Sequence, residues 1–143
     1  LTATFQTGAA ALNDADRLSD VLTLEGTGGD LFVLELRLDA GVLDGPAQLV
    51  WLDGDVWVNA VDGNSATGVE AIAGFAGSFA LSGASATADY LGSWGYDVAS
   101  GSVWAVLDHQ SAFAVAVPEP GNGVLLGIAG VAAVLGFRRR FSC

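Results

Sequence analysis

The feature that most constrains the fold is a strict alternation of apolar and other side chains over residues 31–38. One face of this run carries Phe32, Leu34, Leu36 and Leu38. The other face carries Val33, Glu35 and Arg37. Because successive side chains of a strand point to opposite faces, this alternation is typical of a half-buried β-strand. The run therefore predicts a strand with one face toward a core.

Three pairs of apolar runs have the spacing of β-hairpins, because each pair is separated by a short segment rich in Gly or Asp. The pairs are 21–25 with 31–38, 48–52 with 56–61, and 102–107 with 112–117. Residues 1–7 and 78–81 are weaker strand candidates. The capping-box pattern of 67–70, which stands before residues 71–73, predicts a short helix. Together these patterns predict an all-β fold, an antiparallel β-sandwich or rolled sheet, in one domain of residues 1–117.

The charge of the chain is unevenly distributed. Residues 1–117 hold 15 acidic groups and two cations, Arg17 and Arg37, a net charge of −13. Such a body has no means of neutralising phosphates, so nucleic-acid binding is excluded as a function. The single cysteine, Cys143, allows no internal disulfide, and the spacing of a zinc site is absent.

Catalytic residues are hard to assemble from this sequence. Asp108, His109 and Ser111 invite a hydrolase interpretation, but a triad normally draws its members from separate segments. His109 is the only histidine, and we expect it in a turn. The carboxylates of Asp53 and Asp55 suggest glycosidase chemistry only if their separation suits it, and acidic turns are common. We therefore predict no catalytic residues and no enzymatic activity.

Calcium is the one cofactor that the sequence suggests. Hard oxygen ligands suit this ion, and residues 53–64 are rich in them. The candidate ligands are Asp53, Asp55, Asp62 and Asn64. The segment does not match an EF-hand loop, which requires Gly at the position of Val58 and Glu at the position of Asn64. Solvated turn carboxylates are the alternative.

The aromatic residues raise the possibility of sugar binding. Trp51 and Trp104 lie in predicted strands, where burial is the usual fate of a large ring. Trp94 and Tyr96 lie in a Gly-rich segment, and we expect them to be exposed. They are therefore the candidate contacts for a glycan.

The last 27 residues, 117–143, differ sharply from the body. Residues 121–137 are uncharged, and Arg138, Arg139 and Arg140 follow at once. A 15-residue apolar helix reaches only about 22 Å, but flanking arginines allow a short helix to insert in a bilayer. A core helix is disfavoured because no polar stripe interrupts the run. We therefore predict a transmembrane-type helix over about 121–139, with the arginines as its cytoplasmic stop.

In this order, Val117, Pro118, Glu119 and Pro120, the apolar helix and the arginine cluster resemble the PEP-CTERM sorting signal of Gram-negative bacteria. The resemblance implies that an exosortase, a transpeptidase-like membrane protease, cleaves the chain near the Pro-Glu-Pro motif. It also implies a transient stay in the inner membrane, followed by release to the cell surface or extracellular matrix.

The body is similar, in residues 53–64, 91–92, 95–97, 103–106, 109–111 and 113–115, to a module that precedes this signal in long exported proteins, often after autotransporter-associated β-strand repeats. The resemblance spans most of residues 20–117. That resemblance brings no enzymatic activity. The sequence therefore predicts an exported structural or adhesion module, with the exosortase, the inner membrane and a surface polysaccharide as partners. The alternatives are a lectin-like or calcium-binding surface domain and, less favoured, a glycan-active enzyme.

Overall fold

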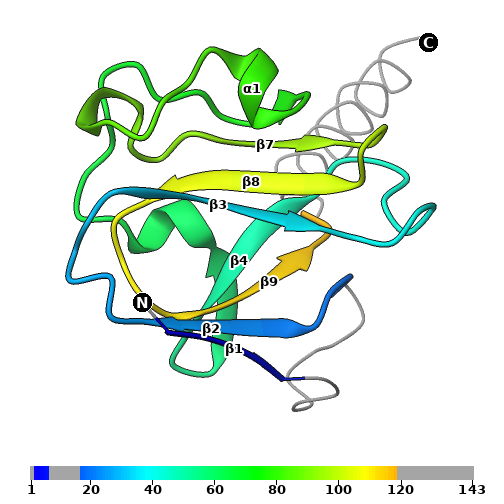
Figure 1. Ribbon diagram of the computed structural model, residues 1–143, viewed down its shortest axis with the longest axis horizontal. Helices are drawn as coiled ribbons and strands as arrows, with labels where there is room; N and C mark the ends of the chain where they lie inside the picture. The colour runs from blue at the N-terminus through cyan, green and yellow to red at the C-terminus, as the bar shows by residue number, and fades with distance from the viewer. Residues whose placement is uncertain (1, 7–16, 119–143) are drawn as a thin grey trace, which may run out of the picture.

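The computed structural model describes residues 2–6 and 17–118, which form two β-sheets with very little helix (Figure 1). The five-stranded sheet has the order β1 (Thr2–Gln6), β2 (Val21–Glu25), β9 (Ala112–Ala116), β4 (Gln48–Asp53), β5 (Val56–Asn59). The four-stranded sheet has the order β3 (Phe32–Arg37), β8 (Ser102–Leu107), β7 (Trp94–Asp97), β6 (Phe75–Ala76). The helical segments are α1 (Phe79–Ser82) and two 3-10 turns, η2 (Ala60–Gly63) and η3 (Ala88–Tyr90). The prediction of an all-β fold is confirmed.

The two sheets share one hydrophobic core. Leu49 and Phe113 reach it from the five-stranded sheet, and Val103 and Leu107 reach it from the four-stranded sheet. All four side chains are fully buried. Removing this apolar surface from water is the main favourable contribution to folding, so the core holds the sheets together in a sandwich-like arrangement.

The strand β8 is buried on both of its faces. Its outer face carries Trp104, whose indole N–H donates to the carbonyl of Gly77 at 2.9 Å. The ring of Phe79, in α1, meets the indole edge-on with the centroids 5.2 Å apart. The segment of β6 and α1 therefore packs against Trp104 on the outer face of β8. Figure 1 shows α1 at the top of the view, next to β7.

One of the three expected hairpins is confirmed. β4 and β5 pair antiparallel, with Asp53 opposite Val56, which leaves Gly54 and Asp55 as a two-residue turn. Gly54 has a φ of 62°, a left-handed conformation that glycine adopts without steric cost.

The other two expected hairpins are wrong. β2 pairs with β1 and β9, whereas β3 pairs with β8 in the other sheet. Likewise β8 and β9 lie in different sheets, so residues 26–30 and 108–111 both cross between the sheets. The physical reason is that alternation fixes which face of a strand is buried but leaves its neighbour to be chosen by packing across the core.

Three local expectations also fail. The segment 67–70 is not helical, because the amides of Gly68 and Glu70 donate to the carbonyls of Leu91 and Asp89, at 2.7 and 2.8 Å. Hydrogen bonding to the Glu70 carboxylate, together with the negative charge of that group, raises the pKa of the Tyr90 hydroxyl. Residues 78–81 fall mostly in the helix α1 and not in a strand. Gly83 ends this single helical turn in a left-handed cap with φ 76°. Finally, β6 and β7 pair parallel, unlike the other pairs of strands described.

The described body ends just after β9. Val117 is 42% exposed and follows the last residue of the strand. Over residues 2–6 and 17–118, no helix has the length and apolar character needed to span a bilayer. The predicted helix 121–139, together with Glu119, Pro120 and Arg138 to Arg140, lies outside the described residues.

Candidate functional site

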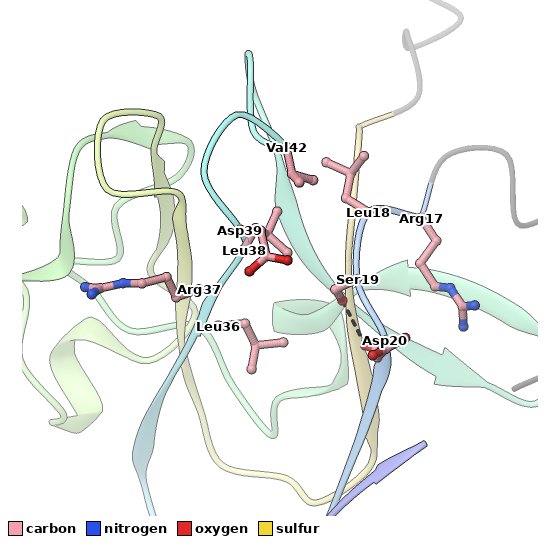
Figure 2. Close-up of a pocket in the computed structure, with 9 residues that line it drawn as sticks. All are labelled: Arg17, Leu18, Ser19, Asp20, Leu36, Arg37, Leu38, Asp39 and Val42. Carbon is pink, nitrogen blue, oxygen red and sulfur yellow. Dashed lines mark hydrogen bonds between the residues drawn. The ribbon is translucent and has the colours of Figure 1, made fainter. Parts of the chain in front are cut away.

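A pocket of about 480 Å³ opens between the two sheets, at the side where β2 and β3 lie (Figure 2). One wall is the segment that leads into β2, and the other is the end of β3 with the turn after it. The lining residues are Arg17, Leu18, Ser19, Asp20, Leu36, Arg37, Leu38, Asp39 and Val42.

A bulge in the pairing of β2 with β9 builds the first wall. Leu22 lies opposite Phe113 and Arg17 lies opposite Ala116, so four residues on one side face two on the other. The extra residues cannot join the ladder and bend away from it. The hydroxyl of Ser19 stands in for the missing backbone partner, because it accepts the amide of Val115 at 2.8 Å.

The second wall is fixed by the core. Leu36 and Leu38 pack against the shared hydrophobic cluster, and the amide of Leu38 donates to the carbonyl of Gly101 at 2.8 Å. The chain then turns, with the amide of Val42 donating to the carbonyl of Asp39 at 3.1 Å. Val42 remains 40% exposed at the pocket mouth.

Charge surrounds this pocket and apolar side chains fill its middle. Both arginines of the described residues, Arg17 and Arg37, line it. Figure 2 shows the two guanidinium groups pointing outward on opposite sides, with Leu18 and Leu36 between them. This arrangement suits an apolar or extended segment with charges at its margin, and it does not form a clamp for one anion.

The pocket carries no assembled catalytic group. Its hydroxyl, on Ser19, accepts from Val115 and donates to the carbonyl of Asp20 at 2.8 Å, so it is fully used in holding the bulge. A nucleophile needs an adjacent base within hydrogen-bond reach.

The residues of the hydrolase interpretation are engaged elsewhere. The Nε2 of His109 lies 2.9 Å from the carbonyl of Ala60, to which it donates. Its ring packs between Trp51 and Phe113, with centroids 5.1 and 5.3 Å away.

The Asp108 carboxylate accepts the amide and the hydroxyl of Ser65. The turn that carries Asp108 and His109 therefore anchors η2 and the chain after it.

The four candidate calcium ligands do not converge. Asp53 and Asp55 lie at the turn of the β4–β5 hairpin, whereas Asp62 and Asn64 follow the opposite end of β5. Three residue positions along β5 separate these ends, roughly 10 Å at 3.3 Å per residue. The side chain of Asn64 is already engaged, because its Nδ2 donates to the Val106 carbonyl and its Oδ1 accepts the backbone N–H of Asp108. Across the described residues, no three His, Cys, Asp or Glu side chains form a metal-binding group.

The candidate glycan contacts are less exposed than expected. Trp94 and Tyr96 alternate with Gly95 along β7, so both rings point to one face and pack against the core cluster. Each is half-buried. Of the two expected buried rings, Trp104 is fully buried and Trp51 is half-buried.

The pocket was not predicted from the sequence. Arg17 and Arg37 are 20 positions apart and stood out only as the two cations of an acidic body. The scarcity of cations was the one sequence feature that pointed to these two arginines, because a rare positive charge in an acidic body is expected to interact with groups near it.

Comparison of the chain with known proteins gives no match to a family model, to a curated protein or to a solved structure. Function therefore has to be inferred from the residues themselves.

Proposed function

We propose that this chain is an exported, non-enzymatic surface or extracellular-matrix module. Its tail acts as a sorting signal that holds the chain briefly at the inner membrane until an exosortase-type protease cleaves it. One observation carries the proposal: the order of the Pro-Glu-Pro motif at 118–120, the uncharged run and the three arginines at 138–140. Each part has a physical task in such a signal.

The Pro-Glu-Pro motif has the task of presenting the cleavage site. Proline donates no backbone hydrogen bond and keeps the residue before it extended, so the segment does not continue a sheet. The apolar run would hold this segment at the membrane, and the arginines would stop translocation and fix the orientation.

Two features of the body fit the proposal. β9 ends at Ala116 and Val117 is exposed, so the motif follows directly after the last strand described. Two of the residues that suggested catalysis, Asp108 and His109, use their side chains in structural hydrogen bonds. A scaffold of two packed sheets needs no chemistry to act as a surface module.

Mass spectrometry of the mature protein from its native host tests the proposal. We expect a C-terminus near Pro120. Replacing Pro118 and Pro120 by Ala should block processing and leave the tail attached. Pro46→Ala is the matched control, since Pro46 is the one other proline and lies exposed in the body, and its processing should be normal.

A second set of variants separates anchoring from cleavage. Replacing Arg138 to Arg140 by Gln should weaken retention at the membrane before processing, because the positive stop is lost. A mature protein that still ends at Cys143 would refute the sorting proposal and leave a permanent anchor in its place.

A further inference from the structure

The strand β3 lies at the border of the four-stranded sheet, with β8 as its one neighbour among the described strands (Figure 1). The N–H of Leu38, one residue after β3, donates to the carbonyl of Gly101, one residue before β8, so the N–H of Leu38 points toward the β8 side. Val106 of β8 lies opposite Val33, but its N–H and C=O bond to Ser93 and Gly92 on the side away from β3. Because backbone groups alternate in direction along an antiparallel strand, the even-numbered residues of β3 face β8.

The odd-numbered residues therefore present their N–H and C=O groups at the other edge of β3, with which no described strand pairs. Those residues are Val33, Glu35 and Arg37. The side chains of Glu35 and Arg37 are exposed on the outward face of the sheet. An edge with unpaired backbone groups is a template for a further strand.

The side chains on this edge restrict what that strand can be. It carries one negative and one positive charge, two positions apart. A two-fold axis through Leu36 lets β3 of one copy pair antiparallel with β3 of a second copy. Arg37 of each copy then lies opposite Glu35 of the other, which gives two pairs of opposite charge. An axis through Glu35 would instead place Glu35 opposite itself, and like charges directly opposite are unfavourable.

We propose that two copies of this chain associate through β3, antiparallel, with Leu36 on the two-fold axis. Glu35 and Arg37 then form hydrogen-bonded pairs, each exchanging two main-chain bonds with its opposite residue. The same pairs bring their side chains together on one face. The two four-stranded sheets become one continuous sheet across the interface.

Apolar side chains at both ends of β3 fit the same arrangement. Leu31, just before the strand, is 36% exposed, and Val42, in the turn after it, is 40% exposed. Antiparallel pairing brings the start of one β3 beside the end of the other. Leu31 of each copy therefore approaches Val42 at the pocket mouth of the other, which removes both from water.

Sedimentation equilibrium of the full chain in a mild detergent, at one ionic strength, tests the association. Wild type should dimerise. Glu35→Arg places two arginines opposite each other and Arg37→Glu places two glutamates opposite each other, so each change should weaken association on the order of tenfold or more. A mixture of the two variants should dimerise again, because each supplies the charge that the other needs.

Two controls make the result specific. Asp55→Arg changes the net charge as Glu35→Arg does but lies at the β4–β5 turn, so it should not weaken association. Leu31→Ser should weaken association, whereas Leu81→Ser should not, although Leu81 is 77% exposed on α1. Far-ultraviolet circular dichroism should show every variant folded as wild type.

Several outcomes would overturn the proposal. A monomeric wild type would do so. Dimers whose dissociation constant is unchanged by both Glu35→Arg and Arg37→Glu would also do so, since association through the apolar tail would then explain them. Equal weakening by Asp55→Arg would reduce the effect to overall charge. The inference does not rest on the proposed export, because its residues all lie in the described body.

Discussion

Gly95 and Trp104 fit closely against each other. They lie opposite each other between β7 and β8. A Cβ atom on Gly95 would lie 2.5 Å from the carbonyl oxygen of Phe75 and 2.7 Å from the indole of Trp104. Because Gly95 has no side chain, the indole of Trp104 can lie close against it and donate to the carbonyl of Gly77.

Gly95→Ala should therefore destabilise the protein by roughly 1–3 kcal/mol, the usual cost of overpacking a close-packed interior. Urea unfolding followed by tryptophan fluorescence measures this loss. Gly45→Ala is the control, because a Cβ there meets nothing within 4 Å, and its midpoint should stay within experimental error of wild type or rise. Equal stability of both variants would show that β7 shifts to make room.

Residue-level predictions succeeded in part for the strand tryptophans. Trp104 was expected to be buried and is, but on the outer face of β8, where the segment of β6 and α1 covers it. Trp51 was expected to be buried on the same ground and is half-buried. Trp94 and Tyr96 were expected outside because glycines surround them, yet the same glycines let β7 pack closely and turn both rings inward. The sequence did not reveal this, because glycine marks loops as readily as close approach of two backbones.

At the scale of elements, the predictable part was the β4–β5 hairpin, because residues 53–55, Asp-Gly-Asp, favour a tight turn and the structure forms one with Gly54 and Asp55. The links 26–30 and 108–111 resemble hairpin turns in composition, but each joins strands of different sheets. The pocket depends on these links and on a bulge, so its residues come together only through long-range packing. No local pattern predicts such a site.

The bulge itself gives a prediction. Ser19→Ala removes the acceptor for the amide of Val115, a fully buried residue, and should cost roughly 1–3 kcal/mol as an unpaired buried donor. Ser85→Ala is the matched control, because Ser85 is exposed and its hydroxyl pairs with Thr87. Thermal unfolding of the two variants compares them directly. A Ser19→Ala protein as stable as the control would mean that water replaces the hydroxyl.

At the scale of the whole molecule, stability should be graded from the centre of each sheet to its border. The amides of β8 and β9, central strands with the most buried residues, should exchange with solvent only on global unfolding. Those of β1 and β6, at the borders, should exchange first. Hydrogen exchange with mass spectrometry checks this order, and protection of β1 equal to that of β9 would contradict it.

The position of β9 also bears on when the body completes its fold. β9 is the last strand of the body, yet it lies between β2 and β4 and joins them into one sheet. Its pairing with β2 closes a loop of almost the whole domain, the kind of non-local contact that forms slowly. Until residues 112–116 are available to pair, β1 and β2 stay separate from β4 and β5, and the five-stranded sheet is incomplete. A body that is threaded through a membrane with its tail last would therefore remain unfinished, and so threadable, until its final strand had crossed.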